Sequence, residues 1–415
     1  MNYNVIVVGA GPAGLLAAGR AAELGSRVLV LEKMQQAGRK LLITGKGRCN
    51  ITNNAEIDEF LKHVFPDGRF LRNAFSHFFS KDIIELLKKY GVETTLERGG
   101  RYFPKSNLSS DVLKALLAWV NEMKVEIRCG HKVDKLLYDN KKIKGVCSNG
   151  QTFYAENVIL ATGGKSYPAT GSNGEGYALA KKMGHTIEKL RPALVPIETQ
   201  GDIPKKLQGL TLKNVKAVVW ANGKKLGDAF GEMLFTHFGL SGPIILSLSR
   251  IVVDELLKGN KLEITIDLKP ALDEQKLDKR LLRDLNEHGK MKLANIFRQW
   301  LPASMIPVFI EILNLNAEKE CHQVSAKERK QIRNLMKNMR FKVTNHRPFK
   351  EAIITAGGIS TKEIYPKTME SKIVSGLYFA GEIIDVDAET GGYNLQIAYS
   401  TAWLAGNSCK ITKKI

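Results

Sequence analysis

The chain has 415 residues, of which 44% are hydrophobic, so it is long enough for two or three globular domains and is not a disordered chain. Its formal net charge is +20, from 62 Lys and Arg against 42 Asp and Glu, which favours anionic partners such as phosphates, acidic metabolites, nucleic acid or an anionic membrane surface. The lysines are dispersed as pairs, without a dense arm or interleaved aromatic residues, which predicts solvated basic faces and argues against a dedicated nucleic-acid binder.

The cysteines exclude several kinds of chemistry. There are five of them, far apart in the sequence and never in C-x-x-C spacing, which argues against a disulfide framework, a zinc site and a thioredoxin-like redox pair. No apolar run reaches the roughly 18 residues that a membrane-spanning helix needs, and the N-terminus lacks a basic leader. We therefore predict a soluble, cytoplasmic protein without a metal site.

The first 32 residues have the pattern of a βαβ unit. A strand over residues 4–8, a helix over about 12–24 and a strand over 27–31 are predicted, and Gly9, Gly11 and Gly14 form G-x-G-x-x-G between the first strand and the helix. Such glycines permit a tight turn, close approach of a pyrophosphate and close helix packing, and Glu32 is placed to bind a ribose hydroxyl. The pattern predicts a dinucleotide site; the alternative is a glycine-rich turn in an ordinary α/β sheet.

The segment "LLITGKGRCNITN" at residues 41–53 allows three interpretations: a phosphate cradle, a redox cysteine or a basic turn. It is not a Walker A loop, because Lys40 stands five positions before Gly45 and no Ser or Thr follows Lys46. Basic neighbours would favour a Cys49 thiolate, but no second cysteine is near, so packing is favoured over a redox role. His237 and His346 have apolar or aromatic neighbours and are interpreted as structural histidines.

Residues 125–164 predict three short antiparallel strands and then a buried strand over 158–161 that ends in Thr162-Gly163-Gly164. This is a crossover that returns to a parallel sheet. A glycine turn and a helix follow, from about Gly174 to a C-cap at Gly184. The second Gly-x-Gly of this helix has no suitable strand before it, so we expect no second Rossmann unit and no separate NAD domain.

The pattern changes at about residue 191. Alternating segments up to about 270 predict a β-barrel or sandwich, and residues 271–340 have a charged helical periodicity. Buried strands and glycine turns return over 341–415. We therefore predict a discontinuous domain, residues 1–190 and 341–415, that contains an insert over 191–340.

The C-terminal part is predicted to carry the chemistry. A strand over 377–380 leads into Gly381-Glu382, and a glycine turn leads into a helix from about Asn394. A helix N-terminus presents unpaired N–H groups and a partial positive charge of roughly half a unit. Aimed at the N1 and C2 carbonyl edge of a flavin it would stabilise the reduced, anionic ring; the alternative is an ordinary buried helix end.

Together these segments resemble a known family. The chain is similar to the bacterial aminoacetone-oxidase-like FAD-binding proteins, often labelled NAD(P)/FAD-dependent oxidoreductases, in "VVGAGPAGLLAA", "GRKLLITGKGRCNITN", "EMLFTHFGLSGPIIL" and "TMESKIVSGLYFAGEIIDVDAETGGYNLQIAYSTAWLAG". The segments "ILATGG" and "TGSNGEGYALA" also resemble the broader fumarate-reductase-like flavoproteins. The resemblance covers essentially the whole chain and implies an α/β fold: a discontinuous Rossmann-like FAD-binding domain with an inserted β-barrel plus helical domain.

The resemblance also implies contacts with FAD, which we state as expectations. The pyrophosphate would lie at Gly9, Ala10, Gly11, Pro12, Ala13 and Gly14, the adenosine ribose at Glu32 and Lys33, and adenine at the backbone of Val133. Thr44, Gly45, Arg48, Cys49 and Asn50 would line the flavin, to which Lys46 and Arg48 would supply positive charge. Thr162 and Gly163 would flank the diphosphate, Gly381, Glu382 and Asp385 the ribityl chain, and Asn394, Leu395 and Gln396 would present the helix end to the ring. No catalytic acid or base is implied.

The expected function is an FAD-dependent oxidoreductase that passes hydride between flavin N5 and a small organic substrate, held between the flavin face and the inserted domain. NAD(P)H is expected at most as a transient electron donor, with oxygen as an alternative acceptor. Reduction of a conjugated double bond and oxidation of an amine both stay open. The alternatives are an RNA-interacting or RNA-modifying flavoprotein, motivated by the charge, and a non-catalytic FAD-dependent regulator. The oligomeric state is not predicted.

Overall fold

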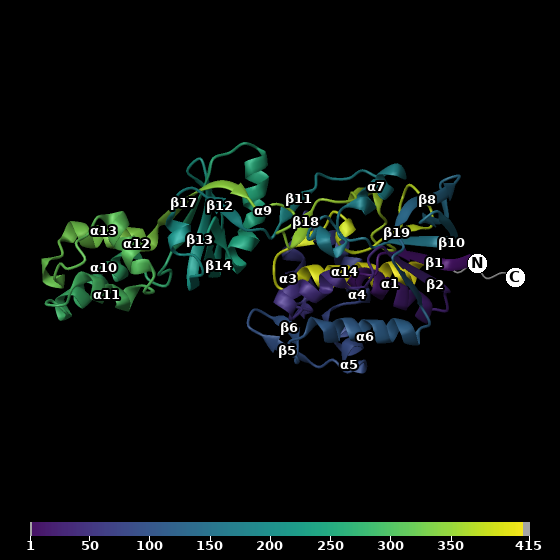
Figure 1. Cartoon of the computed structure of the whole chain (residues 1–415), viewed down its shortest axis with the longest axis horizontal. Helices are drawn as coiled ribbons and strands as arrows, with labels where there is room; N and C mark the ends of the chain where they lie inside the picture. The colour runs from purple at the N-terminus through teal and green to yellow at the C-terminus, as the bar shows by residue number, and fades with distance from the viewer. Residues whose placement is uncertain (1, 410–415) are drawn as a thin grey trace. The chain divides into compact units, whose positions relative to one another are not determined.

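The structure, a computed structural model, describes residues 2–409. The chain divides into two compact units, Met1–Pro192 with Ala352–Ile415, and Ala193–Glu351 (Figure 1). The first unit is therefore discontinuous, and the second is inserted between its parts. Among the described residues no helix is both long and apolar enough to cross a membrane, and no group of three or more His, Cys, Asp or Glu side chains could hold a metal ion.

The first unit is built from strands and helices in alternation. Its strands are β1 Asn2–Val8, β2 Val28–Glu32, β3 Thr52–Asn53, β4 Val64–Phe65, β5 Thr94–Glu97, β6 Arg101–Pro104, β7 Glu126–Cys129, β8 Val133–Asp139, β9 Lys142–Ser148, β10 Gln151–Leu160, β18 Ile354–Ala356, β19 Leu377–Phe379 and β20 Asp387–Ala388, with β11 Arg191–Ala193 at the boundary. Its helices are α1 Pro12–Glu23, α2 Arg39–Ile43, α3 Ile57–Lys62, α4 Arg72–His77, α5 Ser80–Lys89, α6 Ser109–Glu122, α7 Glu175–Lys182 and α14 Tyr393–Ser408. Short 3₁₀ helices are η1 Thr44–Gly47, η2 Gly68–Leu71, η3 Pro168–Thr170, η5 Thr361–Glu363 and η6 Gly381–Ile383.

The central sheet of the first unit has seven strands within residues 2–409, in the order β7-β2-β1-β10-β9-β8, with β19 also paired to β10. β1 and β2 run parallel, as do β1 and β10, and their side chains are almost entirely buried, as expected for a parallel sheet covered on both faces. β10 pairs antiparallel with β9 along its first half and parallel with β19 along its second half. The predicted α/β Rossmann-like fold is confirmed.

The crossover differs in detail from the sequence prediction. β8, β9 and β10 form the expected antiparallel strands, but β7, at the start of the same segment, pairs parallel with β2. The expected third crossover strand and the buried strand over 158–161 are one continuous strand, β10. The reason is that β10 is long enough to pair with β9 at one end and with β19 at the other.

Helices α1 and α14 pack against each other in the first unit (Figure 1). A Cβ atom built on Gly406 of α14 would lie only 2.4 Å from the carbonyl oxygen of Ala17 in α1, so the backbones are in close contact. Arg20 near the end of α1 bonds to Asn407 near the end of α14. The two helices therefore run in the same direction, and their N-termini lie together after the carboxyl ends of β1 and β19, where ligands bind in open α/β sheets.

The second unit contains a barrel and a group of helices. The strands are β12 Ile197–Thr199, β13 Thr211–Ala221, β14 Lys224–Thr236, β15 Gly239–Ser241, β16 Leu262–Asp267 and β17 Met339–His346; the helices are α8 Ile203–Lys206, α9 Pro243–Leu257, α10 Glu274–Glu287, α11 Leu293–Trp300, α12 Met305–Leu313 and α13 Ala326–Lys337, with the 3₁₀ helix η4 Cys321–Gln323. Within the described residues the strands close a barrel in the order β12-β15-β14-β13-β16-β17. The unit ends at Glu351, later than the predicted 340, because β17 pairs with both β12 and β16.

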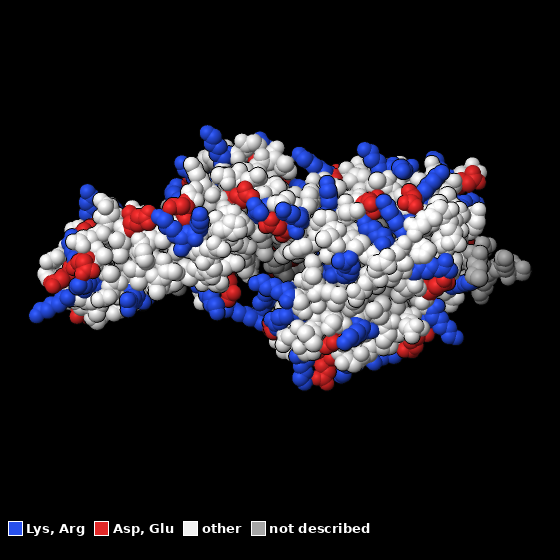
Figure 2. All heavy atoms as spheres, in the orientation of Figure 1, with Lys and Arg blue, Asp and Glu red and all other residues white. Residues whose placement is uncertain are grey.

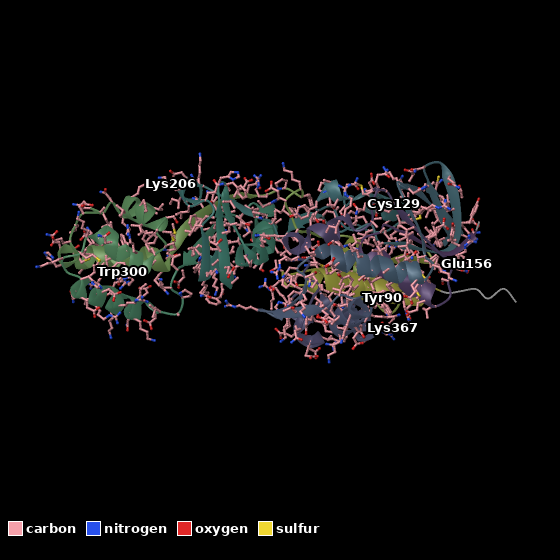
Figure 3. All side chains as sticks on the ribbon, turned by 60° about the horizontal axis from the view of Figure 1, so that its bottom comes forward. Tyr90, Cys129, Glu156, Lys206, Trp300 and Lys367 are labelled. Carbon is pink, nitrogen blue, oxygen red and sulfur yellow. The ribbon has the colours of Figure 1, made fainter. Side chains whose placement is uncertain are left out.

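Helices α10 to α13 form a subdomain with an apolar interior, seen as a group beside the barrel in Figure 1. Trp300, labelled in Figure 3, ends α11 and donates its indole N–H to the buried Asp284 of α10 at 2.9 Å. This bond satisfies the buried carboxylate, which would otherwise be costly, and ties α11 to α10.

Candidate functional site

The glycine turn between β1 and α1 has the space that a dinucleotide needs. Gly9 has a φ of +102°, and a Cβ there would lie 2.6 Å from the carbonyl oxygen of Ala161. A Cβ on Gly14 would lie 1.8 Å from the carbonyl oxygen of Gly9, whereas a Cβ on Gly11 would meet no described atom within 4 Å. The first glycine therefore serves the turn, the third serves packing, and only the second leaves room for a ligand, as in dinucleotide-binding turns.

The start of α1 is open to an anion. The N–H groups of Gly11, Ala13 and Gly14 donate to no group among the described residues; the first N–H bonded back toward the turn is that of Leu15, to Gly11. Pro12 occupies the first turn, where its missing N–H costs nothing, and no acidic residue lies in that turn. The arrangement suits a diphosphate at a helix N-terminus.

Glu32 ends β2 and holds the glycine turn. Its two carboxylate oxygens accept the backbone N–H groups of Ala10 and Met34, each at 2.8 Å. Because a carboxylate oxygen can accept more than one hydrogen bond, this arrangement still permits the predicted contact with ribose hydroxyls. The structure thus adds a second role, fixing the turn, to the predicted one.

Lys33 belongs to a charged network at the start of α7. Its ammonium lies 2.8 Å from Glu175 and 2.7 Å from the side-chain oxygen of Asn173. Burial raises the pKa of Glu175, but hydrogen bonds from Lys33 and Lys132 prevail and lower it to about 2. The network joins α7 to the end of β2, and β8 begins nearby with the buried Val133.

Thr162 supplies a buried polar group without a partner. Its hydroxyl follows β10, is inaccessible to solvent and forms no hydrogen bond among the described residues. Gly163 next to it has a φ of +69°. An unsatisfied buried hydroxyl costs roughly 1–3 kcal/mol. The Cα of Thr162 lies 3.2 Å from a Cβ built on Gly9, whereas its hydroxyl lies against Gly176 of α7, only 1.9 Å from a Cβ built there. The backbone of Thr162 therefore borders the glycine turn, and its hydroxyl faces α7.

Glu382 is the centre of a polar cluster that the sequence did not predict. One of its oxygens lies 2.6 Å from the ammonium of Lys40, and the other accepts the hydroxyl of Ser166 at 2.9 Å and the N–H of Thr355 at 2.8 Å. Lys40 also donates to Ser166 at 2.7 Å, which leaves its third N–H available. Glu382 was expected at the ribityl chain; Lys40, Ser166 and Thr355 are additional candidates.

Gly381 and Asp385 flank Glu382. The N–H of Gly381 donates to the hydroxyl of Thr401 in α14, and a Cβ on Gly381 would lie 2.9 Å from that of Ala13 in α1. With a φ of +75°, Gly381 therefore allows both helices to approach the 3₁₀ helix η6. The backbone N–H of Asp385 donates to Ile359, which orders the segment after η6.

The start of α14 is shifted from the prediction. The N–H groups of Tyr393, Asn394 and Leu395 donate to no group among residues 2–409, whereas that of Gln396, expected to be offered to the flavin, donates to Gly392. The side chain of Gln396 is fully buried and bonds to Thr52 and Ser400. Tyr393 therefore replaces Gln396 in the set of free N–H groups, because the helix begins one residue earlier than expected.

Asn394 uses its side chain inside the protein. Its amide accepts the N–H of Ala388 and donates to the carbonyl oxygens of Ala388 and Glu389. This leaves only its backbone N–H for a ligand. The clasp fixes the segment before the glycine turn, so the helix end is held in place before any cofactor binds.

The loop over residues 44–50 places its charges differently from the prediction. Arg48 does not face the ligand as a free cation: it pairs with Glu97, donates to Asn107 at 2.8 Å and lies over the ring of Phe103. Lys46 is exposed, with a φ of +58° and no ion pair among the described residues. Thr44 donates its hydroxyl to Leu41, while Gly45 is exposed and Asn50 is half-buried.

Cys49 is a packing residue. Its side chain is completely buried, and burial raises the pKa of its thiol to about 12. A thiolate favoured by basic neighbours is therefore wrong, because desolvation dominates and only a hydrogen bond with Thr44 opposes it. The favoured packing interpretation agrees with this position.

The two histidines predicted to be structural differ from each other. His237 is exposed rather than embedded, with its ring edge against Phe238, because it lies in the turn between β14 and β15. His346 is half-buried, with Nδ1 at 2.9 Å from the carbonyl oxygen of Arg347, which agrees with a structural role.

One histidine near the start of α14 was not predicted. His63 lies 2.9 Å from Glu389 and stacks on Tyr393, the first residue of the helix. Strand β4 next to His63 pairs with β20. The pair thus secures the segment that leads into the helix end, and no local motif in the sequence marks it.

Residues 3–408 match the family described as HI0933-like protein Rossmann domain. The chain belongs to this family. Members are FAD-dependent oxidoreductases, so this HI0933-like protein is an enzyme of that class, in agreement with the predicted resemblance. FAD is the cofactor that the glycine turn and the helix ends fit.

Two curated relatives match along almost their full length. The chain is 32% identical over 404 residues, 97% of this chain and 98% of the other, to a protein of Clostridium scindens named 3-dehydro-bile acid delta(4,6)-reductase. It is 30% identical over 404 residues, 97% of this chain and 96% of the other, to a protein of Escherichia coli named ribosomal RNA dihydrouridine synthase.

Solved flavoenzyme structures support the fold. The apo Sdh1 complex of Mycobacterium smegmatis aligns with a TM-score of 0.51 and 19% identity, over 98% of this chain and 68% of that chain. The 3-ketosteroid delta1-dehydrogenase of Sterolibacterium denitrificans aligns with a TM-score of 0.50 and 15% identity, over 98% and 99%. At this identity the likeness concerns the fold only.

Proposed function

We propose that this HI0933-like protein reduces a carbon–carbon double bond conjugated to a carbonyl group, using FAD. The named activities of the two full-length relatives share this chemistry: the bile acid named has double bonds in conjugation with a 3-keto group, and dihydrouridine arises from uracil by reduction of the double bond next to its C4 carbonyl. The observation that carries the proposal is the open start of α14, with free N–H groups of Tyr393, Asn394 and Leu395.

Bound FAD would supply the hydride. The substrate accepts it at the carbon β to the carbonyl, the π electrons move to the carbonyl oxygen as an enolate, and a solvent proton adds to the α carbon, so the net change is addition of two hydrogens. The N-terminus of α14 would contribute positive electrostatic potential, which stabilises the negative charge that develops during the reaction. The Lys40–Glu382 pair, held by Ser166, would also contact the cofactor.

NAD(P)H is proposed as a transient electron donor. Among the described residues the only G-x-G-x-x-G turn between a strand and a helix is the one at Gly9. A pyridine nucleotide would therefore reduce the flavin and leave before the substrate binds. This sequence, in which the nucleotide leaves before the substrate binds, applies to a small enone and to a larger substrate.

Two substrate classes follow from the relatives. A steroid-like enone is supported by the 32% identical relative. Uracil in RNA is supported by the 30% identical relative and by the net charge of +20, since excess positive charge favours a polyanion. The chemistry at the flavin would be the same for both.

The test is an anaerobic spectral titration of the purified, FAD-loaded protein. The flavin is first bleached with dithionite, and separately with NADH and NADPH to identify the donor. A 3-keto-4-ene steroid or a uridine-containing RNA is then added, and the return of the oxidised band is followed together with the mass of the product. We expect one of the two substrates to gain two mass units. If neither substrate reoxidises the reduced flavin, the proposal is contradicted.

A further inference from the structure

The barrel presents a mixed aromatic and basic surface on four neighbouring strands. We call this the outer barrel face; it consists of the side chains of β14, β13, β16 and β17 that point away from the barrel interior. The strand register arranges them in three rows: Lys225, Trp220, Glu263 and Lys342; Asp228, Val218, Thr265 and Arg340; and Phe230, Lys216 and Asp267.

The opposite face of the same strands forms the core of the barrel. Val215, Ala217 and Val219 of β13 are buried. On β14, a Cβ on Gly227 or Gly231 would meet Ile251 or Ile244 of α9 within 3.0 Å. Helix α9 therefore packs on the inner face, and the side chains of the outer barrel face are not required to fill the core.

Two aromatic side chains lie on this face. Phe230 is 59% exposed, the largest exposed fraction among the large hydrophobic residues described. The indole N–H of Trp220 donates to the hydroxyl of Thr265 on the neighbouring strand at 2.9 Å, which holds the half-exposed ring across β13 and β16. Phe230 lies on β14 opposite Lys216 of β13, and Lys216 is four residues from Trp220. The separation along the strand is therefore about 13 Å at 3.3 Å per residue, which is room for two or three stacked bases.

The charges of the face are unbalanced toward positive. Each carboxylate of the three rows has a cationic partner: Asp228 pairs with Lys216 and Lys225, Glu263 with Arg340, and Asp267 with Lys337. Lys342 has no ion-pair partner within residues 2–409, and Lys213, Lys224 and Lys261 at the strand ends are exposed and likewise unpaired there. Figure 2 shows how widely Lys and Arg are otherwise dispersed over the visible surface. Glu232, two residues along β14 from Phe230 and on the same side of the strand, has no ion pair within residues 2–409. The unpaired lysines outnumber this carboxylate, so anionic ligands are attracted to this face.

We propose that the outer barrel face binds single-stranded RNA. Bases would stack on Phe230 and Trp220, and phosphates would contact Lys342 and the lysines at the strand ends. Sheets that carry exposed aromatics next to basic residues bind unpaired RNA in this way. The inference rests on the proposed function, because it selects uracil in RNA over a small enone, and a uracil must be unpaired for its double bond to reach a flavin.

The test uses the FAD-loaded full-length protein and a fluorescein-labelled, uridine-rich, single-stranded RNA of twelve nucleotides, with binding followed by anisotropy at low salt. Phe230→Ala is expected to weaken binding about tenfold, since stacking contributes roughly 1–3 kcal/mol per base. Lys342→Ala is expected to weaken it several-fold, and Trp220→Phe to preserve most of it. The matched controls are Tyr154→Ala, a 55% exposed aromatic of β10, and Lys182→Ala, an exposed lysine of α7.

Weaker binding of the Phe230 and Lys342 variants, with unchanged controls, supports the inference. Absence of RNA binding by the wild-type protein, or equal binding by all variants, overturns it. Failure of the proposed function is a separate result: the reduced flavin would not reoxidise with a steroid enone or with RNA, whether or not RNA binds. Melting temperatures of the variants, compared with the wild type, show that each is folded.

Discussion

The three glycines after β1 differ in what a side chain would meet at each of them. At Gly14 an added Cβ would lie 1.8 Å from a backbone oxygen that cannot move freely, while at Gly11 it would point into open space. One sequence motif therefore contains one position needed for folding and one needed only when a ligand is present.

We expect Gly14→Ala to destabilise the protein by several kcal/mol, because backbone overlap forces the helix away from the strand. Gly11→Ala should change the melting temperature little and weaken FAD binding at least tenfold, because its methyl group occupies the space of the diphosphate. Thermal denaturation of the FAD-free protein and fluorescence titration with FAD measure the two effects. Equal FAD affinity of wild type and Gly11→Ala would place the diphosphate elsewhere.

Cys49 is expected to be unreactive. Since burial raises the pKa of its thiol to about 12, the reactive thiolate is nearly absent at pH 8. In the native protein, iodoacetamide should label the half-buried Cys147 well before Cys49. After unfolding, the two thiols should be labelled at equal rates, as measured by peptide mass spectrometry. Rapid labelling of Cys49 in the native protein would revive the redox interpretation.

At the scale of elements, α14 combines a buried body with an open end. Its residues from Gln396 to Gly406 are almost all buried, so the helix cannot shift without disturbing the core. The Asn394 clasp and the His63–Glu389 pair fix the segment that leads into it. A rigid helix end with free N–H groups is pre-organised for a negative charge, which is what electrostatic stabilisation of a reduced flavin requires.

The His63–Glu389 pair gives a pH-dependent contribution to stability. The hydrogen bond to Glu389 raises the pKa of His63 despite its partial burial, with Glu59 adding to the shift and Lys62 opposing it. A raised pKa means that the stabilisation is complete below the unfolded value of about 6.5 and is lost as pH rises through the folded value.

We expect the stability difference between wild type and His63→Gln to be largest near pH 6, at no more than about 1 kcal/mol because Glu389 is partly solvent-screened, and to vanish in alkaline solution. Urea denaturation across this pH range measures it. His77→Gln, at an exposed histidine of α4, is the control. A difference that grows with pH would contradict the assigned pairing.

At the scale of the whole molecule, the chemistry and the proposed RNA surface lie in different units. The glycine turn, Glu382 and the start of α14 belong to the discontinuous first unit, and the outer barrel face to the inserted one. The net charge of +20 is spread over both, so non-specific attraction of a polyanion is a property of the entire chain, while stacking is local to the barrel.

This division predicts a specific salt dependence. The logarithm of the RNA affinity should fall linearly with the logarithm of the salt concentration, and Lys342→Ala should reduce the slope by about 0.7, the value for one phosphate contact on a single strand. Phe230→Ala should weaken binding without changing the slope, since stacking releases no counterions. Anisotropy titrations at four salt concentrations measure this. A slope changed equally by Lys182→Ala would mean that the attraction is non-specific.

Most of the first unit could be anticipated from short segments. The strand, glycine turn, helix and terminal Glu32 are consecutive, and their spacing reflects backbone requirements that hold in any context. The alternation of the insert likewise indicated strands, and the charged periodicity indicated helices. These features depend on residues that are neighbours in the chain, so they can be predicted from the sequence alone.

The side-chain partners depended on packing between distant segments. Lys40 and Glu382 are 342 positions apart, Arg48 is neutralised by Glu97 on β5, and Cys49 is buried in spite of basic neighbours. Likewise, Trp220 and Phe230 share one face only because of the register between β13 and β14. Local sequence sets backbone conformation, but desolvation, ion pairing and strand register arise only when remote residues are brought together, and these decide which side chains are available for chemistry.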